Sequence, residues 1–265
     1  MLKHSHMNRT IQSGLLSLYR LSHATGVLST AWGRSVFDRV YTGYKTLLEA
    51  PHINLLSTMV VQGTHIIDVG AFHGFFTVKF GRWVSQAGKV IAIEPEPENY
   101  ARLQRIVATS GLNDRVETVQ AAVAERSGEL RLELNPLSPV DHKLGEEGIR
   151  VKAVTIDDLL EARGWPPVSL MKIDVQGAEE KVLAGAVRTL SMFQPSLFIE
   201  VSDETLARYG SSAERLLRIL VEKGYTIHRL SKTSISTALT IVEALSIQQS
   251  RGYADFLFLH SRRGS

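Results

Sequence analysis

Hydrophobic and polar positions along the chain follow one pattern up to about residue 62 and another beyond it. From Gly63 onward, short β-rich runs alternate with amphipathic helical stretches, an order typical of a mostly parallel sheet with helices on both faces. We predict helices over Phe75 to Ser85 and Pro97 to Ser110. The predicted strands are His65 to Val69, Val90 to Glu94, Val116 to Ala121, Leu170 to Asp174, Leu197 to Val201, Tyr225 to Arg229 and Ala254 to His260. The pattern therefore predicts an α/β fold with seven strands.

Two segments lie outside this alternation. Residues 1–62 show helical periodicity without strand signals, so we predict an N-terminal helical extension or cap that precedes a single domain over residues 63–265. Leu130, Leu132 and Leu134 alternate with polar residues, and Val151 and Val154 follow a loop rich in turn residues. This spacing predicts a β-hairpin inserted after the third parallel strand, where it would overhang the sheet edge.

Composition narrows the class of protein. The chain is 44% hydrophobic, but no run approaches the roughly 18 apolar residues that a membrane-spanning helix needs. There is no cysteine and no convincing secretory core, which favours a reducing compartment and predicts a cytoplasmic location. The net charge of +3 comes without a basic block, so nucleic acid is not an expected partner.

The strongest local motif is a hydrophobic strand that ends in an acid and enters a two-glycine turn. Asp68 precedes Gly70 and Gly74 here, and such turns at the carboxyl end of a central strand are where open α/β sheets bind ligands. Glu94 ends the next strand, 24 residues after Gly70, close to the offset at which an acid binds ribose hydroxyls. Together they predict a cofactor that contains adenosine.

The turn also bears on which adenosine cofactor is bound. A dinucleotide usually needs Gly-x-Gly-x-x-Gly around its pyrophosphate, whereas Phe72 stands at the second glycine position here. A sulfonium cofactor carries no phosphate and has a positive charge, which suits the neighbouring Asp68. The residues therefore favour S-adenosylmethionine, with an NAD-dependent oxidoreductase as the alternative.

A longer set of motifs resembles the FkbM family of methyltransferases. These are the run from Met171 to Glu179, the stretch from Pro195 to Val201, the Glu94-Pro95 pair with Glu98 and Asn99, the Ala121-Ala122-Val123 strand end and the segment from Thr155 to Leu159. The resemblance covers about Ile66 to Glu200. It implies a Rossmann-like class I methyltransferase sheet of seven strands with an antiparallel last strand, S-adenosylmethionine as methyl donor, and O-methylation of a hydroxyl on a small molecule, polyketide, sugar or glycan.

The resemblance and the chemistry together predict the cofactor site. Asp68, Gly70 and Gly74 are expected around the methionine part, Glu94 on the ribose, and the Ala121-Ala122 strand end against the adenine. The full predicted cofactor-binding set is Asp68, Gly70, Ala71, Phe72, Gly74, Thr77, Glu94, Pro95, Asn99, Ala121, Ala122 and Asp174.

Methyl transfer to an unactivated hydroxyl requires a base near the strand ends. Asp174 is the first candidate, Glu200 the second, and Lys172 lies two residues before Asp174 on the same strand face. Asp174 and Glu200 are also suitable oxygen ligands for magnesium. Other interpretations are a structural capping pair of Asp174 and Glu179, or a base at His73 or His142.

The chain departs from the family pattern at two positions. Phe72 stands where the turn usually carries Asn, and Gln176 where the later motif usually carries Glu. These departures motivate a second hypothesis, a catalytically inactive protein that binds an adenosine cofactor or docks a partner.

Overall fold

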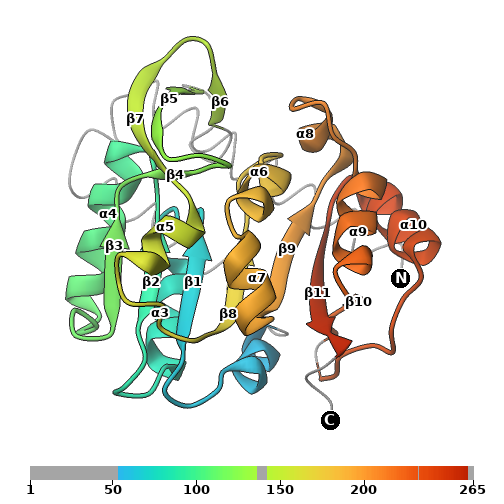
Figure 1. Ribbon diagram of the computed structural model, residues 1–265, viewed down its shortest axis with the longest axis horizontal. Coiled ribbons are helices and arrows are strands. Elements are labelled where there is room, and N and C mark those ends of the chain that lie inside the picture. The colour runs from blue at the N-terminus through green and yellow to red at the C-terminus, as the bar shows by residue number, and fades with distance from the viewer. Residues whose placement is uncertain (1–52, 136–141, 232, 262–265) are drawn as a thin grey trace, which may run out of the picture.

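The centre of the protein is a seven-stranded sheet with the order β10-β11-β9-β8-β1-β2-β3 (Figure 1). The computed structural model describes residues 53–135, 142–231 and 233–261. β11 runs antiparallel to β10 and β9, and the other neighbours are parallel. The strands are β1 (His65–Val69), β2 (Val90–Ile93), β3 (Val116–Val119), β8 (Val168–Ile173), β9 (Ser196–Val201), β10 (Tyr225–His228) and β11 (Ala254–His260). The predicted mostly parallel sheet with an antiparallel last strand is confirmed.

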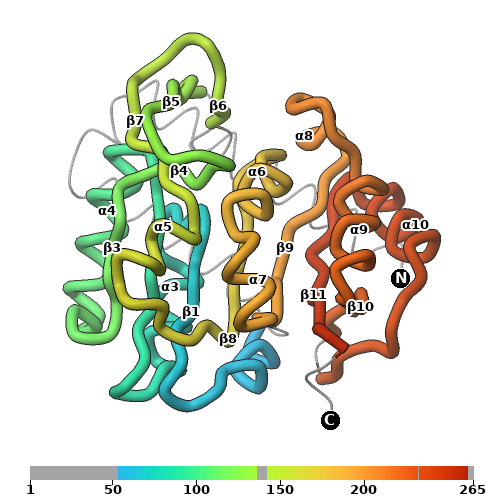
Figure 2. The backbone as a smooth tube through the Cα atoms, in the orientation of Figure 1, coloured from blue at the N-terminus to red at the C-terminus, as the bar shows by residue number. Residues whose placement is uncertain are grey.

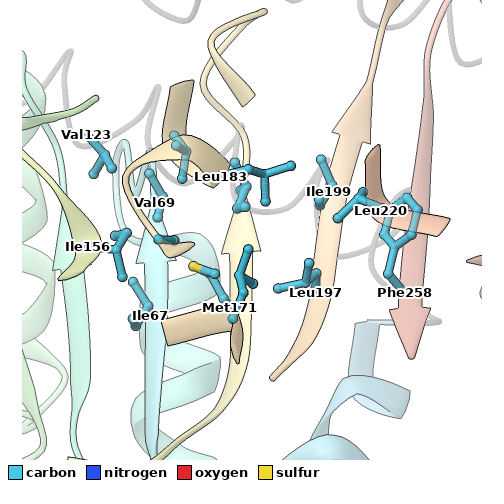
Figure 3. Packing of buried hydrophobic residues seen from close by; sticks show 14 of the residues in the cluster. Ile67, Val69, Val123, Ile156, Met171, Leu183, Leu197, Ile199, Leu220 and Phe258 are labelled. Atoms are coloured by element: carbon cyan, nitrogen blue, oxygen red, sulfur yellow. The ribbon is translucent and has the colours of Figure 1, made fainter. Parts of the chain in front are cut away.

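Successive residues of each central strand enter two different hydrophobic cores, one on each face of the sheet. Ile67 and Val69 of β1 pack with Met171 of β8 and Leu197 of β9 in the first core (Figure 3), whereas Ile66 packs in the second. The first core is covered by α5 (Ile156–Glu161), α6 (Glu179–Ala184), α7 (Val187–Phe193), α8 (Asp203–Ala207), α9 (Ala213–Glu222) and α10 (Ile241–Arg251), and the second by α3 (Phe75–Trp83) and α4 (Pro97–Thr109). The sheet is thus buried on both faces, which explains its near-continuous hydrophobic strands.

The predicted hairpin is part of a second, four-stranded sheet. β5 (Gly128–Glu133) and β7 (Ile149–Val154) pair antiparallel, as expected for the hairpin. However, β6 (Lys143–Gly145) lies between them in sequence and pairs with β5, and β4 (Ala122–Val123) pairs parallel with β7. This small sheet lies beyond the carboxyl end of β1 (Figure 1, Figure 2).

The N-terminal extension predicted over residues 1–62 lies largely outside the described residues. Its described part contains a 3-10 helix, η3 (Ile53–Met59), whose Ile53 and Leu56 are buried in the core beneath α3 and α4. The role of a cap over the site therefore stays a prediction. Among the helices that the structure describes, none is long and apolar enough to cross a membrane.

Helix α7 is capped from outside by a side chain of α5. One oxygen of Asp157 accepts the N–H and hydroxyl of Thr189, at 2.9 and 2.7 Å, and the other accepts the N–H of Arg188 at 2.8 Å. Asp157 is part of a segment that supported the family resemblance, and in the structure it connects α5 to α7. These bonds satisfy N–H groups that a helix start leaves without partners.

We expect Asp157→Ala to lower the free energy of unfolding by about 2 kcal/mol, since it removes a buried cap. Chemical denaturation measures this loss. Asp158→Ala is the matched control, because its exposed carboxylate contacts Ser127 instead of a helix start, and we expect a smaller loss. Equal losses in the two variants would contradict the capping role.

Candidate active site

A buried ion pair lies beneath the turn that follows β1. The register of β1 and β8 places Asp68 directly beside Lys172, and their side chains are 0% and 4% exposed with Nζ 3.5 Å from Oδ1. The Lys172 ammonium also donates to the carbonyls of Gly70 at 2.7 Å and Val69 at 3.3 Å, and Thr77 donates its hydroxyl to Asp68 Oδ2 at 2.6 Å. Burial raises the pKa of Asp68, and Lys172 opposes that rise. Asp68 therefore holds the Lys172 ammonium in place, and this ammonium in turn holds the backbone carbonyls of the turn.

Gly70 is the point where the turn meets the end of β8. Its φ is +73°, in the left-handed region that favours glycine, and a Cβ at this position would overlap the carbonyl oxygen of Asp174. Because Gly70 has no side chain, the turn can contact the backbone of Asp174, the first predicted base.

The first three backbone donors of the turn, those of Gly70, Ala71 and Phe72, are used within the protein. The N–H groups of Gly70 and Ala71 both donate to the carbonyl of Ile93 at 3.0 Å, and the N–H of Phe72 donates to Glu94 Oε2 at 2.9 Å. A pyrophosphate needs such N–H groups as ligands. The turn therefore fits a cofactor without phosphate better than a dinucleotide.

Glu94 holds the end of β2 against the turn. One carboxylate oxygen accepts the N–H of Phe72, and the other accepts the N–H of Glu96 at 3.1 Å across Pro95. Burial raises the pKa of Glu94 to about 7. A carboxylate has about four acceptor positions, so two remain for hydroxyl groups of a ligand.

Phe72 and His73 form a stacked pair beside Glu94. Their ring centroids are 3.6 Å apart and nearly parallel. His73 Nε2 lies 3.2 Å from a guanidinium nitrogen of Arg102 and 3.1 Å from the side-chain oxygen of Asn99. Burial and then the charge of Arg102 lower the pKa of His73 to about 3. A base of that pKa is weak, so the geometry favours His73 and Asn99 as supports of the turn.

Two other predicted cofactor residues support the turn from behind. A Cβ at Gly74 would lie 2.6 Å from a methyl group of Ile106 and 3.0 Å from one of Leu103, so glycine lets the start of α3 pack on α4. Thr77 is fully buried against Asp68. Their contacts explain both residue types by packing around the turn.

Ala121 and Ala122 lie where the chain leaves the main sheet. Both are buried, and Ala122 pairs with Ala153 in the second sheet. β3 ends two residues before Ala121, earlier than predicted, because the chain turns toward β7. Contact with adenine stays a prediction for this pair.

The predicted bases Asp174 and Glu200 meet at the carboxyl ends of β8 and β9. Gln176 joins them, because its side-chain nitrogen lies 3.2 Å from Asp174 Oδ1 and 3.3 Å from Glu200 Oε1. Lys172 Nζ lies 3.5 Å from Asp174 Oδ2, and the Asp174 side chain is 29% exposed. The structure thus brings Asp174, Glu200 and Lys172 together, and adds Gln176, which the predicted site set omits although its motif contains it.

Glu179 supports the loop that carries Gln176. Its Oε1 accepts the N–H of Gly177 at 3.0 Å and that of Val175 at 3.4 Å, and burial raises the pKa of Glu179 to about 7. Glu179 therefore supports the loop before α6 and does not cap the helix itself, whereas Asp174 contacts Gln176 and Lys172.

A bridging magnesium ion fits this arrangement poorly. The Gln176 amide donates to both Asp174 and Glu200, so a donor takes the position between the two carboxylates that a cation would need. No group of three or more His, Asp or Glu side chains within the described ranges is placed to hold a metal ion.

The other candidate base, His142, accepts the N–H of Asn135 at 3.1 Å through Nδ1.

Known methyltransferases share sequence with this chain. The methyltransferase sdnD of Sordaria araneosa is 30% identical over 45% of this chain and 59% of its own length. The 2-O-methyltransferase NoeI of Sinorhizobium fredii is 26% identical over 58% of this chain and 70% of its own. The hexuronic acid methyltransferase AglP of Haloferax volcanii is 29% identical over 40% of this chain and 44% of its own. The chain thus spans less than two thirds of the length of two of these three relatives.

The match to a domain family is more extensive. The sequence profile of the methyltransferase FkbM domain covers residues 68–227, from the acid before the glycine turn to β10. This range holds Asp68, Lys172, Asp174 and Glu200 and amounts to more than half of the 265 residues. The chain therefore belongs to the FkbM methyltransferase family.

Proposed function

We propose that this protein is an S-adenosylmethionine-dependent methyltransferase that methylates a hydroxyl oxygen of a small molecule or sugar. The observation that carries the proposal is the turn after β1, whose first three N–H groups are used internally while the carboxylates of Glu94 and Asp174 lie beside it. Such a site suits a phosphate-free, positively charged cofactor. The names of NoeI and AglP, a 2-O-methyltransferase and a hexuronic acid methyltransferase, support the acceptor class.

Cofactor binding is assigned to three parts of the turn region. Glu94 would accept the ribose hydroxyls through its remaining acceptor positions. The backbone around Gly70 would approach the amino acid part, with Asp68 and Lys172 holding that backbone in place. Lys172 is therefore assigned a positioning role, because its ammonium is engaged with Asp68 and the carbonyls of the turn.

S-adenosylmethionine, when bound, supplies a methyl group activated by a sulfonium. The protein must then orient the acceptor hydroxyl and accept its proton. Asp174 is the proposed base, since its partly exposed carboxylate lies beside the turn, with one oxygen 3.5 Å from the Lys172 ammonium. Glu200 would accept a hydrogen bond from the same acceptor or from a neighbouring hydroxyl.

We expect affinity for S-adenosylmethionine to rise about tenfold from pH 6 to pH 8, because ribose hydroxyls donate to the ionised form of a carboxyl whose pKa is about 7. Below that pH, Glu94 is protonated in the unliganded protein and must lose a proton to bind. Glu94→Gln should bind more weakly and lose this pH dependence. Isothermal titration across the pH range measures both effects.

Parallel titrations with S-adenosylhomocysteine and NAD test the cofactor class. The proposal expects binding of both sulfur compounds and none of NAD, followed by release of S-adenosylhomocysteine from S-adenosylmethionine when a hydroxyl acceptor is added. A folded protein that binds NAD alone would overturn the proposal. Binding without transfer to any hydroxyl acceptor would favour the inactive binding protein.

A further inference from the structure

The side chain of Gln176 lies between the two carboxylates at the acceptor end of the site. Its amide nitrogen carries two hydrogens, and it has two carboxylate partners, Asp174 and Glu200, at 3.2 and 3.3 Å. The partners belong to different strands, β8 and β9, which pair in register up to Ile173 and Ile199. Gln176 therefore connects the ends of two strands that carry the proposed base and its neighbour.

The backbone of Gln176 is held in a conformation that side chains seldom adopt. Its φ is +54°, which is uncommon for a residue with a Cβ and strains the backbone. The loop stays in this form because Glu179 accepts the N–H groups on both sides, those of Val175 and Gly177. The left-handed backbone and the hydrogen bonds to the buried Glu179 carboxylate together fix the direction of the Gln176 side-chain amide.

The charges around the amide explain why a neutral donor suits this position in this chain, although the family pattern usually carries Glu here. Asp174 and Glu200 contact it directly, Lys172 lies on the far side of Asp174, and Glu179 lies behind the loop. Asp68 faces Lys172 in turn. Among the residues that the structure describes, carboxylates thus outnumber the ammonium group in this cluster, and a third acid between Asp174 and Glu200 would add repulsion.

We propose that Gln176 is a positioning residue whose amide holds Asp174 and Glu200 in one fixed arrangement toward the acceptor hydroxyl. This inference rests on the proposed function for its catalytic meaning, whereas the bridge itself can be tested without a cofactor. Gln176 matters here as a donor to both carboxylates, and the isosteric change to glutamate reverses that property.

The test compares Gln176→Glu with wild type and with Gln194→Glu. Gln194 is a matched control, because it also has a left-handed backbone, with φ +47°, but ends α7 away from the site. The free energy of unfolding of each protein is measured by denaturation from about pH 5 to about pH 8. Titration with S-adenosylhomocysteine runs alongside.

The expected result is a deficit in Gln176→Glu that grows with pH. Two neighbouring carboxylates raise the pKa of the introduced carboxyl in the folded state above its unfolded value of about 4.3, so its stability contribution is lost as pH rises through the folded pKa. At low pH the protonated carboxyl can still donate one hydrogen bond. Gln194→Glu should show a clearly smaller pH-dependent deficit, since its carboxylate would meet only the C-terminal end of α7. Affinity for S-adenosylhomocysteine should stay within about twofold of wild type in both variants.

The rate of methyl transfer distinguishes a positioning role of Gln176 from a purely structural one. With neutral methyl pyranosides as acceptors, Gln176→Glu should release S-adenosylhomocysteine at least about tenfold more slowly than wild type near pH 8, and the gap should narrow near pH 5.5. A deficit independent of pH, or equal in Gln194→Glu, would overturn the bridge. Unchanged turnover in Gln176→Glu would overturn the positioning role. Silence of the wild type with the pyranosides counts against the proposed acceptor class and leaves the stability comparison to decide the bridge.

Discussion

Lys172→Met is expected to lower the free energy of unfolding by about 3–5 kcal/mol, the cost of leaving a buried charge without its partner. Asp68 is fully buried, and Lys172 is the cation beside it in the paired strands. The substitution also removes donors from the carbonyls of Gly70 and Val69. We therefore expect a second effect, a loss of cofactor affinity, because the carbonyls of the turn lose their hydrogen bonds to the ammonium group.

The double variant Asp68→Asn with Lys172→Met isolates the charge effect. It removes the buried anion together with its partner, so we expect it to recover about half of the lost stability. Lys181→Met is the surface control, since its ion pair with Glu125 is partly exposed and should contribute less than about 1 kcal/mol.

The pH dependence of Lys172→Met provides an independent check. Burial already raises the pKa of Asp68, and loss of Lys172 raises it further. An acid with a raised folded-state pKa stabilises the fold at low pH and loses that contribution as pH rises. The deficit should therefore widen from about pH 5 to about pH 8. A constant deficit would mean that lost packing, and not the charge of Asp68, dominates.

Gly70→Ala is expected to abolish measurable binding of S-adenosylmethionine and to lower stability by about 3 kcal/mol or more, the sum of left-handed strain and overpacking. The new methyl group would overlap the Asp174 carbonyl, so the turn and the end of β8 must separate. That separation displaces both the protein backbone that we propose contacts the cofactor and the proposed base, Asp174. Titration with the cofactor and denaturation measure the two effects.

Gly111→Ala separates the two causes. Gly111 also has a positive φ, +67°, but a Cβ there would have no atom within 4 Å. Its substitution should cost about 1 kcal/mol from backbone strain alone and leave cofactor affinity unchanged. If Gly70→Ala costs no more than Gly111→Ala, the contact between the turn and Asp174 is not essential.

The sequence determined the local elements of this protein because their signals are local. Short β-rich runs between amphipathic helical stretches predicted each strand of the main sheet to within two residues, and β1 (His65–Val69) and β11 (Ala254–His260) at both ends. The glycine turn, Glu94 and the motif around Asp174 likewise indicated which strand ends carry the site. The carboxyl ends of parallel strands meet at one edge of the sheet, so the sequence also predicted that Asp174 and Glu200 lie at the same edge.

The tertiary structure decided which of these groups contact each other. A two-residue period assigns a side chain to a face, but the register between strands far apart in sequence determines its neighbour. Asp68 therefore acquired Lys172 as a buried partner only through the pairing of β1 with β8. The left-handed backbone at Gln176 similarly directs its amide between two strands. Periodicity cannot reveal such contacts, because they depend on packing across the sheet and on backbone angles that neighbouring elements impose.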